Sequence, residues 1–215
     1  MTDGNETMTD EQLAQRAQGG DWASFDELVS RFEARIYRFA FNCCGHETDA
    51  REIAQETFVT AYFQIKRFDP ARSMATWLFT IARRKGIDRS RRARPLFTDE
   101  MPELPDMDDP SVLMARREAT AVIWRVARRV LPDLQFQALW LRYDEDLTVL
   151  ETAQVLCRTQ MHVKVILFRA RAKLAREVER IAEVERASSR PVALGTSTAT
   201  KPETHLEAAV AKRAL

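Results

Sequence analysis

Residues 49–94 read DAREIAQETFVTAYFQIKRFDPARSMATWLFTIARRKGIDRSRRAR, and this stretch decides the fold. It contains two helical segments joined by the short break Phe68–Ser73, in which Pro70 prevents simple continuation of a helix. The first segment has an apolar stripe at spacings of three and four, with most of its acidic residues outside the stripe. In the second, the apolar face ends at Ala82, and beyond it bases occur all around the helix. The pattern predicts one helix that contacts a protein and one that contacts a polyanion.

The same periodicity predicts helices along most of the remaining chain. A capping-box pattern at Thr9–Gln12 opens a short helix, and a longer one runs from an expected cap at Asp21 to a stop at Gly45. Four further helices are expected at about 111–130, 133–143, 148–156 and 160–183, with Thr148 and Thr159 as caps. The expected fold is all-α: two small helical domains joined by an acidic, Pro-rich linker, the second domain containing a helix-turn-helix.

The domain boundary follows from a change in composition. Residues 95–110 hold four prolines and six carboxylates without a helical period, which is typical of an extended tether. After residue 187 the chain is rich in Ser, Thr, Pro and Gly, so a disordered tail is expected. The predicted parts are a first domain at 9–95, a linker at 96–110, a second domain at 111–186 and a tail at 187–215.

Composition excludes several classes of protein. Three cysteines among 215 residues cannot all pair within the chain, which argues against a secreted disulfide framework. No apolar run is typical of a signal peptide or a membrane span, so we expect a cytoplasmic protein without membrane insertion. Cys43, Cys44 and His46 offer only a partial ligand set, so packing is favoured over a metal site. No catalytic constellation stands out, and we expect no enzyme activity, metal or cofactor.

Several motifs, taken together and in this order, resemble the extracytoplasmic-function sigma factors of bacterial RNA polymerase. Those similar to the first domain of that family are Gly20–Phe25, Asp49-Ala50, Gln55–Phe58, Trp77–Arg83, Asp88 and Arg91-Arg92. Those similar to its second domain are Leu131-Pro132, Leu141–Tyr143, Glu151–Ala153, Val163-Lys164 and Arg169–Leu174.

The resemblance implies that Glu52, Gln55 and Glu56 dock on the clamp helices of the largest polymerase subunit. Polar residues that flank an apolar stripe suit such docking of one helix on another. Without the family pattern, a solvated acidic helix face is the simpler interpretation.

The resemblance also implies that the loop Phe68–Met74 captures a flipped base of the minus-10 promoter element. Cations are needed along the separated strands. The DNA-binding residues expected here are Phe68, Arg72, Ser73, Arg83, Arg84, Lys85, Arg91 and Arg92. For Trp77, which lies on the apolar stripe, core packing is favoured over stacking on a base. Arg84 stands where the family usually has asparagine, which favours affinity for the DNA backbone.

In the second domain, the resemblance implies a recognition helix in the major groove of the minus-35 element. The residues expected to contact DNA are Gln160, Lys164, Phe168, Arg169 and Arg171. Val165 and Ile166 replace a usual hydroxyl and guanidinium. Cys157 replaces a usual glycine, so a non-glycine residue with a left-handed backbone is expected there.

The function implied is that of a sigma factor that directs RNA polymerase to specific promoters and initiates transcription, in response to a stress or envelope signal. Its partners would be core RNA polymerase and promoter DNA, with an anti-sigma factor as a further candidate. The alternative is a sigma-like interaction module with weakened DNA readout, which binds polymerase or an anti-sigma regulator. An ordinary helix-turn-helix repressor or activator is disfavoured because it leaves the first domain unexplained.

Overall fold

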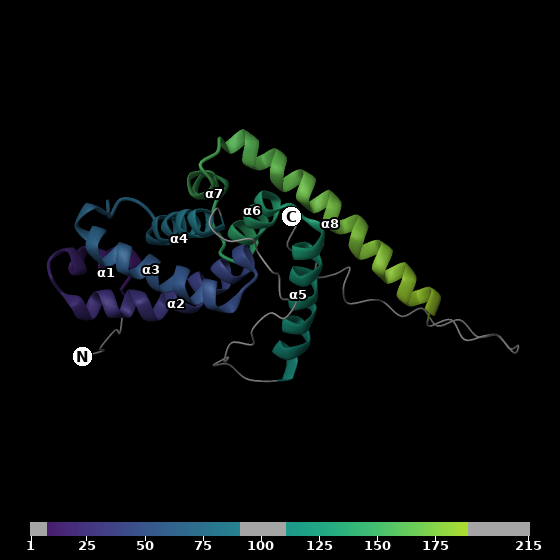
Figure 1. Ribbon diagram of the computed structural model, residues 1–215, viewed down its shortest axis with the longest axis horizontal. Helices are drawn as coiled ribbons and strands as arrows, with labels where there is room; N and C mark the ends of the chain where they lie inside the picture. The colour runs from purple at the N-terminus through teal and green to yellow at the C-terminus, as the bar shows by residue number, and fades with distance from the viewer. Residues whose placement is uncertain (1–7, 91–110, 189–215) are drawn as a thin grey trace, which may run out of the picture.

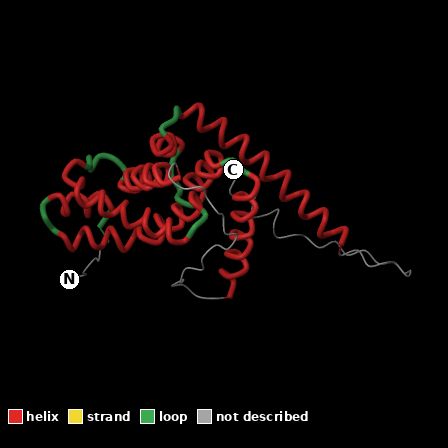
Figure 2. Tube along the Cα trace, viewed as in Figure 1, coloured by secondary structure: helices red, strands yellow, loops and turns green. Residues whose placement is uncertain are grey.

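The computed structural model describes residues 8–90 and 111–188, and all regular elements in these two ranges are helices (Figure 2). The first domain consists of α1 (Asp10–Gln18), α2 (Trp22–Cys44), α3 (Glu47–Gln64), the short 3-10 helix η1 (Ile65–Arg67) and α4 (Met74–Ser90). The second consists of α5 (Ser111–Val130), α6 (Asp133–Tyr143), α7 (Val149–Leu156) and α8 (Gln160–Ser188). The all-α fold is thereby confirmed. The acidic linker and residues 189–215 of the predicted tail lie outside the described residues.

Local signals in the sequence begin and end these helices as expected. Both capping boxes are formed, at Thr9 before α1 and at Thr148 before α7. The hydroxyl of Thr159 accepts the backbone N–H of His162 at 3.2 Å and so caps α8. Gly45 ends α2 in the left-handed conformation, with φ 71°, which glycine adopts without a Cβ clash.

Asp21 behaves differently from the expected cap. It occupies the N-cap position of α2, but its side chain makes no capping hydrogen bond to the backbone. Instead its carboxylate accepts a hydrogen bond from the hydroxyl of Ser24 at 2.8 Å and pairs with Arg16 of α1 at 2.7 Å. The same oxygen serves both partners, so Asp21 ties α1 to α2.

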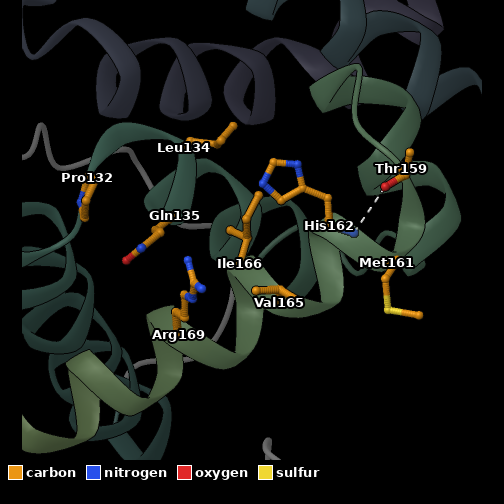
Figure 3. A pocket seen from close by; sticks show the side chains of 9 residues that line it. All are labelled: Pro132, Leu134, Gln135, Thr159, Met161, His162, Val165, Ile166 and Arg169. Carbon is orange, nitrogen blue, oxygen red and sulfur yellow. Dashed lines mark hydrogen bonds between the residues drawn. The ribbon is translucent and has the colours of Figure 1, made fainter.

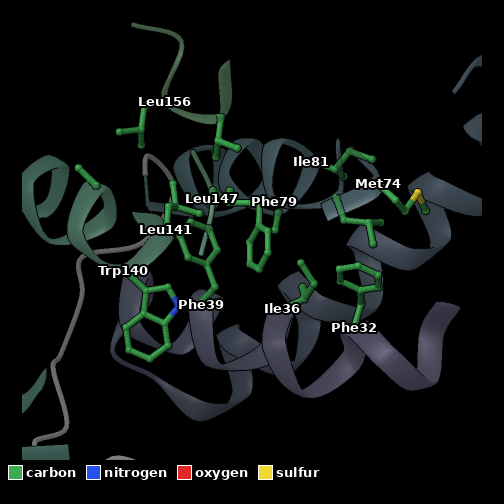
Figure 4. Packing of buried hydrophobic residues seen from close by; sticks show 14 of the residues in the cluster. Phe32, Ile36, Phe39, Met74, Phe79, Ile81, Trp140, Leu141, Leu147 and Leu156 are labelled. Carbon is green, nitrogen blue, oxygen red and sulfur yellow. The ribbon is translucent and has the colours of Figure 1, made fainter. Parts of the chain in front are cut away.

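One apolar core runs through both domains (Figure 4). From the first domain, Phe39 of α2 and Phe79 of α4 meet edge to face with their ring centroids 5.3 Å apart. From the second, Trp140 and Leu141 of α6 and Leu156 of α7 belong to the same buried cluster. Burying a large apolar side chain contributes about 1.5–3 kcal/mol, so this shared core holds the two domains together.

The domains touch where α7 packs along α4 and α6 meets α2 (Figure 1). A buried carboxylate lies at this junction: Glu145, just after α6, has a side chain only 1% exposed. It accepts hydrogen bonds from Arg35 of α2 at 2.8 Å and from the indole nitrogen of Trp140 at 3.3 Å. Burial raises the pKa of Glu145, and the nearby charge of Arg35 opposes that rise. We call the Arg35–Glu145 pair the interdomain ion pair.

None of the helices in the described parts of the chain is both long enough and apolar enough to span a bilayer.

Candidate functional site

The outward face of α3 carries the three residues expected to dock on polymerase. Glu52, Gln55 and Glu56 are all exposed. At about 100° per residue they lie within a sector of about 100° of the helix, and Val59 and Phe63 lie inside the same sector. Phe63 is 78% exposed, and Val59 is 49% exposed. We call these five residues the α3 stripe.

Sequence reasoning missed the apolar end of the α3 stripe because it singled out only the apolar residues expected to face the core, and Val59 and Phe63 are not among them. The spacing of four, seven and eleven residues after Glu52 is the signal that could have found it. Beside the stripe, Trp22 of α2 lies against Tyr62 with ring centroids 4.9 Å apart, and Tyr62 contacts Phe63 at 5.5 Å. The α3 stripe therefore ends in an exposed aromatic patch.

The acidic end of the α3 stripe is paired with bases of α4. The Lys85 ammonium lies 3.3 Å from a carboxylate oxygen of Glu56. Arg89 donates to Asp49 at 2.7 Å and also pairs with Glu52. Burial by itself lowers the pKa of Arg89, but its hydrogen bonds to these two carboxylates raise it overall. In this structure, carboxylates expected to contact polymerase thus neutralise lysine and arginine side chains of α4 that lie next to the expected DNA contacts.

The loop expected to capture a base is held firmly by the rest of the first domain. The side-chain amide of Gln18 donates to the carbonyl of Phe68 at 2.6 Å. The Phe68 ring is 5% exposed and packs against Trp77 with centroids 5.1 Å apart, so it shapes the loop from inside. Trp77 is half-buried against the core, as favoured from the sequence. Arg72 is exposed, and the hydroxyl of Ser73 accepts a backbone N–H from the first turn of α4.

The bases of α4 point in different directions, as the pattern predicted. Arg83 is half-buried and donates to Gln137 of α6 at 3.1 Å, and burial lowers its pKa. The second domain therefore covers this expected DNA contact. Arg84 is exposed. Arg91 and Arg92 lie outside the described residues.

Four of the five residues expected to read the minus-35 element share one exposed face of α8. Gln160, Lys164, Phe168 and Arg171 lie within about 80° of each other around the helix. Arg169 lies about 100° or more from each of them, on the side of α8 that faces α6 (Figure 3). The structure thus brings together four of the predicted contacts and separates the fifth.

An apolar groove lies between the start of α6 and the start of α8, where Leu134, Val165 and Ile166 are among the lining residues (Figure 3). Ile166 is 5% exposed and belongs to the core, whereas Val165 faces outward. Met161 and Phe168 are 70% and 67% exposed. The first turns of α8 therefore present an apolar surface between their polar residues.

Packing accounts for the cysteines of the first domain. Cys43 packs against the core, and burial raises the pKa of its thiol to about 12. The thiol of Cys44 donates to the carbonyl of His46 at 3.3 Å. Cys157, exposed at the end of α7, has φ 52°, which confirms the left-handed backbone expected there. In the two described ranges, no three His, Cys, Asp or Glu side chains are grouped as metal ligands would be.

Two known families match this chain. Residues 28–95 match the family described as Sigma-70 region 2, and residues 129–176 match Sigma-70, region 4. The first match contains the α3 stripe and the loop before α4, and the second contains α6, α7 and most of the basic part of α8.

Individual relatives agree with these matches. The ECF RNA polymerase sigma factor RpoE of Cereibacter sphaeroides is 32% identical over 135 residues, which cover 62% of this chain and 74% of the relative. SigW of Bacillus subtilis, also an ECF sigma factor, is 28% identical over 171 residues, 74% of this chain and 91% of the relative. BldN of Streptomyces coelicolor is 29% identical, over 77% of this chain, and the match spans 64% of its own length.

Among solved structures, that of CnrH in complex with the cytosolic domain of CnrY superimposes with a TM-score of 0.60 at 27% identity. It covers 80% of this chain and 97% of the CnrH chain.

Proposed function

This chain belongs to the extracytoplasmic-function family of bacterial sigma factors, and we propose that its α3 stripe docks on core RNA polymerase while α4 and α8 contact the promoter. The protein directs the polymerase to specific promoters and initiates transcription there. The observation that carries the residue assignment is the exposed α3 stripe beside the loop Phe68–Ser73 and the bases of α4, all within one helical domain.

The α3 stripe suits a helical partner. Its acidic end offers charge complementarity to bases, and its apolar end offers an exposed aromatic side chain that a partner can bury. Aromatic anchors of this kind often dominate the energy of an interface, and complementary charges steer the encounter. The proposed domains remain those expected from the sequence, at 9–95 and 111–186, with the acidic linker between them.

For DNA, Arg72 and Arg84 are exposed in the free protein and supply the first contacts with phosphates. Arg83 becomes available only when Gln137 and the second domain move away from it. On α8, the face of Lys164 and Arg171 is open to a DNA groove. We propose that the protein acts in the cytoplasm, with the polymerase, and lends it specificity without catalysing a reaction itself.

Run-off transcription with core polymerase tests this function. Promoter-specific transcripts are expected, whereas polymerase binding without any transcript would contradict it. In a parallel measurement of polymerase binding, Glu56→Arg is expected to abolish the binding. Glu183→Arg makes the same charge change near the exposed end of α8 and is expected to have no effect. Unchanged affinity of the Glu56→Arg protein would contradict the docking face.

The exposed apolar side chains of α8 favour a second candidate function, a module that mainly binds proteins. Met161, Val165 and Phe168 form a surface that a polypeptide could cover more readily than a phosphate backbone could. The related CnrH is found in complex with a polypeptide, the cytosolic domain of CnrY. A regulator of the anti-sigma kind is therefore a candidate partner here as well. This reading predicts polymerase or regulator binding with no dependence on promoter sequence.

A further inference from the structure

Lys85 and Arg89 of α4 are held by carboxylates of α3. These pairs join residues of the proposed polymerase face to bases next to the proposed DNA face. Glu56 and Glu52 are about half exposed, so a partner can reach them without unfolding the helix. Lys85 and Arg89 are less exposed, with their charged ends turned toward α3. Lys85 and Arg89 therefore compete with positively charged side chains of a partner for the same two carboxylates.

This arrangement affects DNA binding directly. A lysine or arginine side chain that is already paired with a carboxylate gains less free energy from contact with a phosphate, because the first pair has to be broken. Such a paired side chain also releases fewer counterions from DNA. The salt dependence of binding is therefore shallower than the number of lysine and arginine side chains implies. The effect is local: other bases of the domain, such as Arg84, remain exposed.

We infer that polymerase docking and DNA binding are coupled through these ion pairs: when polymerase engages Glu52 and Glu56, Lys85 and Arg89 are released to contact DNA phosphates. The inference rests on the proposed docking face. Coupling of this kind is reciprocal, so DNA contact at Lys85 and Arg89 also strengthens polymerase binding by the same factor. In the free protein, the pairs with α3 therefore weaken the contact of Lys85 and Arg89 with phosphates.

Asp49 limits the size of the effect. It lies outside the α3 stripe and pairs with Arg89 at 2.7 Å, so withdrawal of Glu52 removes one of the two carboxylates that hold Arg89. Lys85 pairs with Glu56, which belongs to the α3 stripe, and is the side chain more completely released. Release therefore adds between one and two phosphate contacts.

The test imitates withdrawal of the carboxylates in the full-length free protein. The double variant Glu52→Gln/Glu56→Gln keeps both side-chain shapes and removes both charges. The control is Glu27→Gln/Glu47→Gln, which changes the net charge equally. It too removes carboxylates paired with arginines of their own helices, α2 and α3. Binding of a labelled oligothymidylate strand of about 20 nucleotides is followed by fluorescence anisotropy over a range of salt, since this term is independent of sequence.

The Glu52→Gln/Glu56→Gln protein is expected to bind the strand about fivefold more tightly at low salt than the control variant does. Its plot of log affinity against log salt is expected to be steeper by about 0.7 to 1.4, because each phosphate contact on a single strand adds about 0.7. Equal slopes for the two variants would overturn the inference.

Polymerase binding by the same two proteins separates this inference from the proposed function. Loss of polymerase binding together with an unchanged DNA slope refutes the coupling and leaves the docking face standing. A steeper slope with intact polymerase binding refutes the docking face, and the coupling with it, because polymerase would not then withdraw these carboxylates. Loss of polymerase binding with a steeper slope supports both.

Discussion

Replacing Arg35 by methionine is expected to loosen the junction between the two domains. Arg35 sits over the rings of Phe32 and Phe79, with its guanidinium carbon 4.6 and 5.8 Å from their centroids, and it pairs with the buried Glu145 at 2.8 Å. Arg35→Met keeps a long stem on both rings and removes the charge. The carboxylate of Glu145, which is 1% exposed, then loses its ion-pair partner and keeps its hydrogen bond from Trp140.

The size of the loss follows from the burial of the two partners. Removing one member of a buried ion pair costs about 3–5 kcal/mol because the other charge stays desolvated. Arg35 is itself 31% exposed, so part of its attraction is already screened by water. We therefore expect the lower end, about 3 kcal/mol near neutral pH.

The loss should depend on pH in a defined direction. Burial raises the pKa of Glu145 above its ordinary 4.5, so between 4.5 and the raised value the folded state binds more protons than the unfolded state. Stability from this group is therefore gained as pH falls through that window. Without Arg35 the pKa rises further, and the deficit of the Arg35→Met protein should shrink on acidification toward 4.5.

Urea denaturation followed by tryptophan fluorescence measures both effects, and Trp140 reports on the junction itself. The double variant Arg35→Met/Glu145→Met serves as the control, since replacing the whole pair by apolar side chains should restore most of the loss. A loss below about 1 kcal/mol for Arg35→Met, or a deficit that grows on acidification, would refute the reasoning.

Three further outcomes are expected. Phe63→Ala should weaken polymerase binding about tenfold, because burying the 78% of this side chain that is exposed contributes about 1–2 kcal/mol, whereas Val184→Ala on α8 should leave affinity unchanged in the same titration. Phe68→Ala should lower the free energy of unfolding by about 3–5 kcal/mol in chemical denaturation, and a loss near zero would show that the ring is not part of the core. In the native protein Cys157 should be alkylated readily while Cys43 resists, since the thiol pKa of about 12 at Cys43 leaves little thiolate at neutral pH. Mass spectrometry of the digested protein measures the labelling of each cysteine, and equal labelling of the two would contradict the burial of Cys43.

Much of the fold could be predicted from the sequence because its signals are local. The capping boxes at Thr9 and Thr148 and the left-handed stop at Gly45 depend on residues within one or two turns of each other. The left-handed backbone at Cys157 was expected from the resemblance, because the family usually has glycine at this helix end. Helix periodicity gave the buried faces for the same reason, since residues three and four apart lie on one side of a helix.

The candidate site was predictable in part. The exposed acids of α3 and the face shared by Lys164 and Phe168 follow from position along a single helix. The apolar end of the α3 stripe at Phe63 could have been found by the same spacing. Arg169, by contrast, faces the groove beside α6, and only the packing of α8 on α6 shows which of its sides is covered.

The sequence by itself determined the family, the helices and the order of the functional segments, because these reside in motifs and in short-range periodicity. Only the tertiary structure decided which charges meet. Arg89 and Asp49 are 40 residues apart, and Arg35 and Glu145 are 110 apart. No spacing rule connects positions so distant, since their contact depends on how whole helices pack. That packing places the bases of α4 against the acids of α3 and the second domain over Arg83, and so determines which of the expected binding residues are open in the free protein.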